Sequence, residues 1–557
     1  MIAGVFCPGV CWPWRLHVLK VLLSDRFLPR LTTHSCPPLH DHSHRDGFVS
    51  GRFNLLDLVV LLAYLGGTTA LGMWIGRSQK SANDYFVAER SIPWWAVMFS
   101  IVASETSALT FISIPGLAYI GNLGFLQVVA GYIIGRIVVS FTLLPRYFKG
   151  NLVTAYALLE TRFGLTTRRF TSILFMCTRA MADAVRVFAT AIPVALIIGP
   201  VVPEAYAMPG AILVLGLLTV VYTYRGGMKA VVWTELVQAS VYVVGGLSAA
   251  WLIGQSVTGG WGSIMDQAGA AGKLQLINWK FDISNPHTMY AGLIGGAFLA
   301  MASHGADQLI VQRLLSSRSL KDAQRALIGS GFVVFAQFTL FLMVGIGLWV
   351  VFENRSFPAT DQIFPTYIIE RMPHGLIGLI VAAIVAATMS THSGTINALA
   401  ASTTHDIYLP LTGRSADDPR TLQVGKYFAL AWGLGLTGGA LLFTDNGTPV
   451  VVVALGIASF TYGGLLGGFF LGIFWQRAIQ RDAILGMSVG IFCMAFIVFA
   501  KPLVAAFPST AGALGDFAKI AWPWYVLIGL SITMLTGILS SYTHPFPTDA
   551  DTPAVRA

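Results

Sequence analysis

The sequence has few charged residues for its length. Only 11% of its 557 residues are Asp, Glu, Lys or Arg, whereas soluble globular domains carry about 25%. Hydrophobic residues make up 55% of the chain. This composition excludes an ordinary soluble domain and predicts an all-α integral membrane protein. Barrel strands are excluded because the apolar runs are too long and too continuous.

Cysteine and catalytic motifs are also scarce. There are five cysteines, and three of them lie in the first fifty residues, at spacings that match no standard zinc module. Cys177 and Cys493 fall within apolar runs and imply no disulfide framework. No HExxH motif is present, and His392 and His405 are too far apart to form a metal pair on one helical turn. We therefore predict that the protein is not an enzyme.

Apolar runs of about 20 residues, the length needed to cross a bilayer as a helix, recur from Leu55 to Ser540. We predict thirteen membrane spans, at 54–76, 93–118, 124–145, 170–199, 210–224, 230–255, 288–312, 326–353, 375–408, 426–443, 448–474, 482–500 and 521–541.

Loop charges predict the orientation of these spans. With the amino terminus outside, nineteen Lys and Arg residues fall in cytoplasmic loops and six in the opposite loops, as the positive-inside rule requires. The net charge of +9 therefore reflects topology, and nucleic acid is not an expected partner. We predict a multi-pass protein of the cell membrane, a bacterial inner membrane, with a cytoplasmic carboxyl terminus.

Two spans are interrupted by small and polar residues. The second has Ala103-Ser104-Glu105-Thr106-Ser107 at its middle, and the seventh has Ser303-His304-Gly305-Ala306-Asp307. Five spans separate them, so the halves that they begin have opposite orientations. Paired broken helices of this kind indicate a transporter site near the midplane of the membrane. The alternative is two ordinary helices with small residues at close contacts.

The ninth span carries many hydroxyl groups, in the stretch VAATMSTHSGTINALAASTTHDIY. Ala387, Ser390 and Thr391 are spaced i, i+3 and i+4, so they share one face of the helix. Neutral hydroxyl and carbonyl oxygens suit a bare alkali cation. We predict that these three residues and the carbonyls of Ala103 and Thr106 hold a sodium ion. The alternative is that both hydroxyls bond back to their own helix.

Four stretches occur in an order that resembles the sodium/solute symporter family: SANDYFVAERSIPWW, RGGMKAVVWTELVQ, GADQLIVQRLLSSRSLKDAQRAL and ATMSTHSGTINALAASTTHDIY. The resemblance covers roughly residues 54–500. It implies a five-plus-five inverted repeat of discontinuous helices, the LeuT-like fold, formed by spans two to six and seven to eleven. Carried over by motif position, the family's principal sodium site falls on the same five residues.

The resemblance and the spans together predict the organisation of the chain. We expect an amino-terminal tail (1–53), a first helix with its cytoplasmic loop (54–91) and the first repeat (92–255). An extracytoplasmic loop (256–287), the second repeat (288–474), two peripheral helices (475–541) and a cytoplasmic tail (542–557) follow. We expect the amino-terminal tail either to be disordered or to result from a start codon that was assigned too early.

A second sodium site, found in some family members, is less well matched here. Those members use an aspartate in a WTD motif and paired serines one turn along the ninth span. This chain has Glu235 in place of the aspartate, and Gly394 follows Ser393. A site made by Glu235, Ser390 and Ser393 stays open, but we expect one sodium per cycle.

The resemblance places the solute between the second, third, fourth and seventh spans. Glu105 lies in the break itself, so we expect it to recruit a cation, either Arg179 or an amine of the solute. Arg179, Asp183 and Arg186 share one face of the fourth span, where they either form a network with each other or contact the solute. The substrate-binding candidates are Glu105, Ser107, Thr110, Gln127, Arg179, Asp183 and Ser303.

Together these features predict a sodium-coupled symporter that imports a small polar organic solute by alternating access and works as a monomer in the lipid bilayer. Sodium is expected as a co-transported ion. Two alternatives stay open: a solute sensor built on a transporter-like domain, and a proton-coupled carrier of the same fold.

Overall fold

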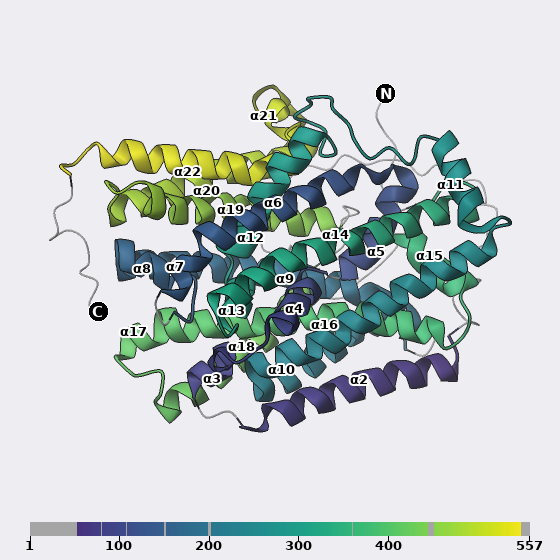
Figure 1. Cartoon of the computed structure of the whole chain (residues 1–557), viewed down its shortest axis with the longest axis horizontal. Coiled ribbons are helices and arrows are strands. Elements are labelled where there is room, and N and C mark those ends of the chain that lie inside the picture. The colour runs from purple at the N-terminus through teal and green to yellow at the C-terminus, as the bar shows by residue number, and fades with distance from the viewer. Residues whose placement is uncertain are drawn as a thin grey trace, which may run out of the picture. The chain divides into compact units, whose positions relative to one another are not determined.

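The predicted spans form helices in the computed structural model (Figure 1). The structure describes residues 53–78, 81–106, 108–149, 152–198, 202–358, 360–443 and 450–546. The predicted amino-terminal tail lies outside these ranges except for Phe53, as do Ser107 and the last eleven residues of the carboxyl-terminal tail.

The helices of the first half follow the apolar runs closely. They are α2 (Leu55–Ile75), α3 (Ala82–Val87), α4 (Trp94–Glu105), α5 (Ala108–Ile120), α6 (Leu126–Thr142), α7 (Leu144–Phe148), α8 (Ala157–Phe163), α9 (Leu165–Ile198), α10 (Glu204–Ser256) and α11 (Gly260–Ala270). The fifth and sixth predicted spans both lie in α10. They are separated by Gly227, whose φ of 55° and ψ of −161° bend the chain in a way that glycine permits and other residues do not.

The second half of the chain is also helical. Its helices are α12 (Gly296–Gly305), α13 (Gln308–Leu315), α14 (Leu320–Val351), α15 (Ile363–Arg371), α16 (Leu376–Ser402), α17 (Leu409–Thr412), α18 (Pro419–Leu442), α19 (Val450–Phe474), α20 (Gln480–Ala506), α21 (Ala511–Ala518) and α22 (Tyr525–Ser541). A π-helical turn, Ala291–Gly295, precedes α12, and another, Thr403–Tyr408, follows α16.

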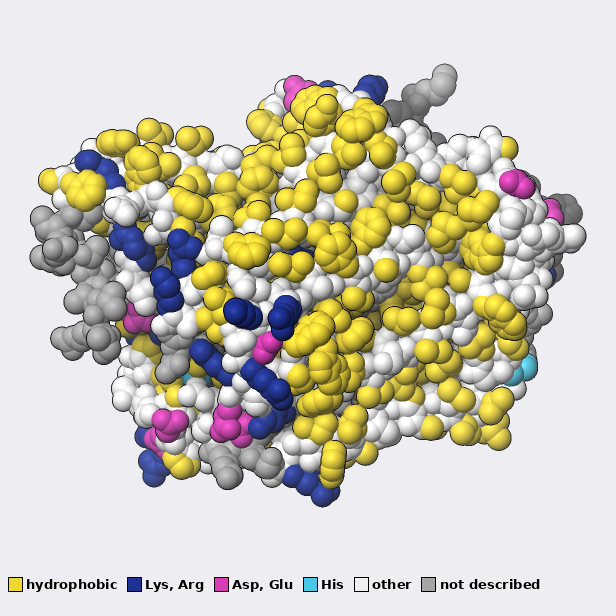
Figure 2. Space-filling model, viewed as in Figure 1, with side chains coloured by type: hydrophobic (Ala, Val, Ile, Leu, Met, Phe, Trp, Pro, Cys, Tyr) yellow, Lys and Arg dark blue, Asp and Glu magenta, His cyan; other side chains and the backbone are white. Residues whose placement is uncertain are grey.

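Length and apolarity mark several of these helices as membrane spans. Within the described residues seven helices meet both criteria, and the bent pair of α4 and α5 is an eighth candidate. The count of thirteen spans stays a prediction. Hydrophobic side chains cover most of the face shown in Figure 2, and Lys and Arg gather near the end where α3, α7, α8 and α17 lie.

Burial distinguishes the central helix from a peripheral one. In the most apolar stretch of α16, 89% of the residues are buried inside the protein, compared with 22% for α2. α16 packs against α10, α9, α2, α18 and α4. A central helix can bring polar groups together away from lipid, so the hydroxyl groups of α16 lie where an ion site is feasible.

Candidate functional site

The first break lies where the second predicted span becomes polar. α4 ends at Glu105, and Thr106 has an extended conformation with φ −79° and ψ 96°. Ser and Thr side chains compete for backbone hydrogen bonds and so weaken a helix at such a point. The helical segments on the two sides, Trp94–Glu105 and Thr110–Ile120, are bent by 62°. The end of α4 thereby lies against α16.

Four of the five predicted sodium ligands line one small cavity. Ala103 and Thr106 come from the end of α4, and Ala387 and Ser390 come from α16. The cavity has a volume of about 20 Å³, and one water-sized particle needs about 10–15 Å³. The space therefore fits a single small ion.

Thr391, the fifth predicted ligand, lies beside the same cavity. Its Oγ1 donates to the carbonyl oxygen of Ala387 at 3.1 Å and lies 3.4 Å from that of Ser104, across the interface with α4. The structure therefore brings all five residues together, and Thr391 also makes the bond to its own helix that the alternative reading expects. Their role as sodium ligands stays a prediction.

Glu235, the candidate for a second sodium site, is held by an arginine. Arg313 Nη2 lies 2.5 Å from its Oε1 and Arg313 Nε lies 3.3 Å from its Oε2, and both side chains are fully buried. The hydroxyls of Ser100, Ser104 and Ser390 also donate to the carboxylate. Ser393 instead donates to the carbonyl oxygen of Ser390 at 3.0 Å.

Gly394 makes room for this arginine. A Cβ atom at Gly394 would collide with Nη2 of Arg313, so a serine there requires the guanidinium to move. The glycine that distinguishes this chain from members with paired serines thus coincides with the position of an internal cation.

The second break is closed by its own charged network. Asp307 has extended backbone with φ −90° and ψ 122°, and its Oδ1 accepts the backbone N–H of Leu309 at 2.8 Å, which caps α13. Its Oδ2 pairs with Arg179 of α9 and accepts Tyr462 Oη at 2.7 Å. Arg179, Asp307 and Tyr462 are all buried. Arg179 therefore holds the second break.

Glu105 pairs with Arg136 of α6 and not, as expected, with Arg179. Its side chain is 18% exposed, while that of Arg136 is fully buried and also donates to Ser330 Oγ at 2.9 Å. His304, in the second break, has Nε2 3.6 Å from the same carboxylate. Glu105 thus contacts both α6, through Arg136, and the second broken helix, through His304. The spacing of residues along the chain does not reveal these contacts.

Asp183 makes its direct contacts with α16 and not with the two arginines on its own face of α9. Asp183 Oδ2 lies 2.6 Å from Nδ1 of His392 on α16, and its Oδ1 accepts Thr395 Oγ1 at 3.0 Å. Arg186 forms no ion pair within the described part of the chain, and its Nε is buried without a hydrogen-bond partner. Arg186 therefore lies near the carboxylates of Asp183 and Asp307 but forms a direct ion pair with neither of them.

The other solute candidates are placed differently. Gln127 donates to the carbonyls of Gly124 and His287 and accepts the N–H of Asn278, and it lines a separate cavity of about 280 Å³. Ser303 Oγ lies 2.8 Å from Nδ1 of His304, beside Glu105. Thr110 is buried in α5, and Ser107 is outside the described residues.

A match to a family model decides which family the chain belongs to. The profile of the Sodium:solute symporter family matches residues 85–490, which is well over half of the chain. This chain belongs to the sodium:solute symporter family. It is accordingly a multi-pass, sodium-coupled symporter with a small-molecule solute, and sodium is its co-transported ion.

Individual relatives of this symporter agree with the family. The sodium/sialic acid symporter NanT of Aliivibrio fischeri is 31% identical over 83% of this chain and 91% of its own length. The sodium/glucose cotransporter of Vibrio parahaemolyticus is 27% identical over 80% and 86%.

Solved structures show the fold. A substrate-bound, outward-open sodium-coupled sialic acid symporter, described as having a novel sodium site, aligns with a TM-score of 0.77 at 27% identity over 89% of this chain and 99% of that one. A nucleobase-cation symporter in a closed conformation aligns at 0.51 with 13% identity over 84% and 96%, which speaks for the fold alone. The predicted fold, an all-helical transporter of paired discontinuous helices, is confirmed.

Sequence reasoning missed several residues of this site. Arg136, Arg313 and His392 each bind a carboxylate from another helix. Their signal in the sequence was only that an ionisable residue within a span needs a partner or a function. Arg313 directly follows the predicted span 288–312 and so falls among the expected loop cations, yet it is fully buried.

Proposed function

We propose that the chain imports one sodium ion together with one small organic solute that bears a carboxylate, and that the cavity between α4 and α16 holds the sodium. The observation that carries this proposal is that Ala103, Thr106, Ala387 and Ser390 line one ion-sized space, while Thr391 bonds to the carbonyl oxygen of Ala387. Their carbonyl and hydroxyl oxygens are the ligands that suit an alkali ion. Sodium there joins the broken helix to α16.

One sodium per cycle follows from the state of Glu235. A buried carboxylate needs a cation, and Arg313 already supplies one with two hydrogen bonds. A sodium ion at Glu235 and Ser393 has to displace that guanidinium or share the carboxylate with it. We therefore expect a sodium-to-solute ratio of one, and a measured ratio of two would overturn this part of the proposal.

A carboxylate on the solute is supported by the charges of α9. Arg136, Arg179 and Arg313 each form a direct ion pair with a carboxylate, while Arg186 forms none within the described residues and has Asp183 and Asp307 only nearby. An arginine inside a membrane protein that has no direct carboxylate contact is a candidate to bind a charged ligand. The relatives named for sialic acid transport an acidic sugar, which agrees with this interpretation. The other candidates for contact with the solute are Glu105, Ser107, Thr110, Arg179, Asp183, Ser303 and Gln127, the last of which lines a separate cavity.

Sodium and solute are coupled by reciprocal stabilisation of one conformation. If bound sodium raises the affinity for the solute, the bound solute must raise the affinity for sodium by the same factor. The membrane potential then contributes about 2.3 kcal/mol per charge per 100 mV. We further propose repeats at 92–255 and 288–474, an external amino terminus, a cytoplasmic carboxyl terminus, a monomer in a bacterial inner membrane, and no catalytic activity.

Uptake into proteoliposomes tests this function. Purified protein is first heated with sialic acid, monocarboxylates, amino acids and glucose, each with and without sodium, because a ligand that binds only the folded state raises the unfolding midpoint. The solute that stabilises only with sodium is then used for uptake. We expect sodium-dependent accumulation of an anionic solute. Accumulation of glucose alone would overturn the proposal that the solute carries a carboxylate. Binding without accumulation would favour a solute sensor.

A further inference from the structure

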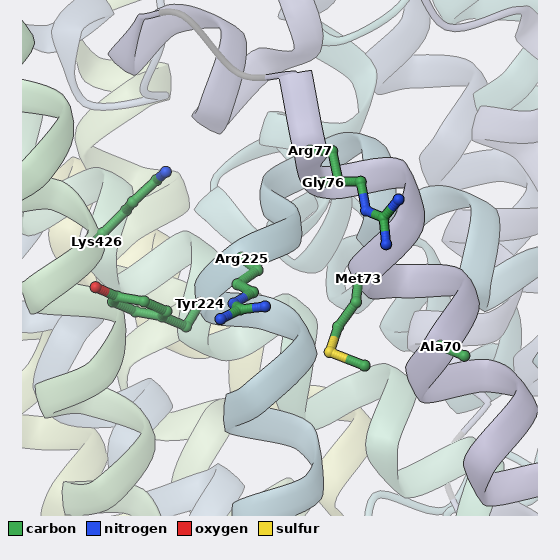
Figure 3. Close-up of a pocket in the computed structure, with 7 residues that line it drawn as sticks. All are labelled: Ala70, Met73, Gly76, Arg77, Tyr224, Arg225 and Lys426. Carbon is green, nitrogen blue, oxygen red and sulfur yellow. The ribbon is translucent and has the colours of Figure 1, made fainter.

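A second cavity, remote in sequence from the sodium site, lies where three helices meet at one end of the bundle. It has a volume of about 460 Å³, within the range of small-molecule sites. Arg77 follows the end of α2, Arg225 lies at the bend of α10 beside Gly227, and Lys426 lies near the start of α18. Figure 3 shows these three side chains reaching the cavity from three different helices.

The cavity concentrates positive charge without a carboxylate. Among the described residues none of the three cations forms an ion pair, and Lys426 Nζ lies only over the ring of Tyr85, at 5.7 Å from its centroid. Lys229, one turn from Arg225, contrasts with them because it pairs with Asp84 at 3.0 Å. Three like charges around one space repel each other, so the cavity is complementary to an anion with several oxygens.

Phosphate is the anion that this set of groups recognises best. Arginine binds phosphate oxygens in a bidentate manner, and lysine adds a point charge. The phenol of Tyr224 also lines the cavity and is able to donate a hydrogen bond.

The apolar wall favours a lipid as the source of the phosphate. Ala70 and Met73 of α2 complete the lining, and α2 presents exposed apolar side chains along its length, with Leu62 56% and Trp74 66% exposed. α2 is thus a lipid-facing helix, and the cavity opens beside it. Basic pockets between membrane helices on the cytoplasmic side are known to bind anionic headgroups.

We propose that this cavity binds the phosphate of an anionic phospholipid in the inner leaflet, with an acyl chain lying along α2. The leaflet rests on the orientation proposed above, whereas the phosphate site does not depend on sodium coupling. A bound headgroup would join α2 to α10 and α18. Gly76 already packs so closely on the backbone of Arg225 that a Cβ atom would collide with it, so the phosphate would add a polar link beside an existing backbone contact.

Thermal unfolding in defined lipid tests this site. Full-length protein in neutral detergent is titrated with phosphatidylglycerol or phosphatidylcholine and heated. We expect phosphatidylglycerol alone to raise the unfolding midpoint. The variant Arg225→Gln/Lys426→Gln should need at least ten times more phosphatidylglycerol for half of the shift, because two of the three phosphate contacts are lost.

A matched control removes two cations elsewhere at the same end. Lys321 and Arg325 are exposed on the first turns of α14 and form no ion pair within the described residues, so Lys321→Gln/Arg325→Gln should keep the wild-type requirement within twofold. An equal response of the cavity variant and the wild type would overturn the proposal.

Two further experiments are needed. The first distinguishes a lipid from a soluble anion as the source of the phosphate, and the second covers the case in which the double variant does not fold. If millimolar inorganic phosphate gives the same shift and abolishes the effect of phosphatidylglycerol, the ligand is a soluble anion and the lipid assignment is wrong. If the double variant does not fold, lipid retention is measured by native mass spectrometry on the wild type and on Arg77→Gln, whose side chain is exposed. Equal retention of phosphatidylglycerol and phosphatidylcholine by the wild type would then overturn the proposal.

Discussion

The two broken helices solve the same problem in opposite ways. In the break between α12 and α13, Asp307 caps the following helix and pairs with Arg179 and Tyr462, so buried side chains satisfy the polar groups. In the break between α4 and α5, Thr106 borders an ion-sized cavity, and the acid beside it is partly exposed. The cavity at the first break, about 20 Å³, is larger than the one of about 10 Å³ beside Arg179 and Asp307 at the second break, where protein side chains already pair with the charged groups.

This difference teaches which break stabilises the fold and which one serves transport. A break filled by buried side chains is costly to disturb, because removing one partner leaves a charge without compensation. A break that borders a cavity can be altered with less loss of stability and more effect on ion binding. Mutations at matched positions test this division.

The largest expected effect is on stability, from Asp307→Ala. The substitution leaves Arg179 buried without its counter-ion and removes the cap of α13. Loss of one partner of a buried pair costs about 3–5 kcal/mol, so the unfolding midpoint in detergent should fall steeply. The double variant Arg179→Met/Asp307→Leu should recover most of the loss, since no buried charge is left. A wild-type midpoint for Asp307→Ala would refute the stabilising role.

Glu105→Ala should destabilise the protein less than Asp307→Ala. Arg136 loses its carboxylate but keeps the bond to Ser330, and the partly exposed position of Glu105 admits water. A hydrogen bond to a charged group is worth about 1.5–3 kcal/mol. The same unfolding measurement gives the order of the two variants, and a reversed order would contradict the comparison.

The double variant Ser390→Ala/Thr391→Ala should leave folding largely intact and weaken the binding of sodium. Two hydroxyl ligands are lost, so the sodium concentration for half-maximal uptake should rise at least tenfold, about 1.4 kcal/mol. Within the described residues the hydroxyls of Thr388 and Thr404 donate to backbone carbonyls one turn earlier in the same helix, so Thr388→Ala/Thr404→Ala is a matched control. Unchanged sodium dependence in the first variant would remove the site assignment.

Gln337→Met should have the smallest effect. Gln337 bonds to the side chain of Thr106, whereas the proposed ligand is the carbonyl of that residue. We expect sodium dependence to change by about twofold, or 0.4 kcal/mol, in the same uptake assay. A shift as large as that of the Ser390/Thr391 variant would mean that the side chain of Thr106 or of Gln337 is itself a ligand.

Much of the fold was readable from local patterns. Apolar length indicated the spans, and polar residues such as Thr106 and Asp307 within apolar runs indicated where helices break, because such residues compete with the helical hydrogen bonds of the backbone. Helical spacing also placed Ala387, Ser390 and Thr391 on one face. These features depend on neighbours in the chain, so the chain alone reveals them.

The pairing of charges was not readable in this way. Glu105 binds Arg136, Glu235 binds Arg313 and Asp183 binds His392, and each pair joins different helices. The position of Glu105 in the break suggested Arg179 or an amine of the solute as its partner, but Arg136 of α6 pairs with Glu105, and Arg179 of α9 pairs with Asp307.

The sequence by itself determined that the chain is a bundle of membrane helices with two polar interruptions and one hydroxyl-rich span, since these follow from periodicity and composition. Only the tertiary structure decided which acid meets which base and which break borders the larger cavity. The physical reason is that an ion pair depends on a few ångströms between helices that are distant in the chain. That separation is set by how side chains pack, and no local pattern encodes it.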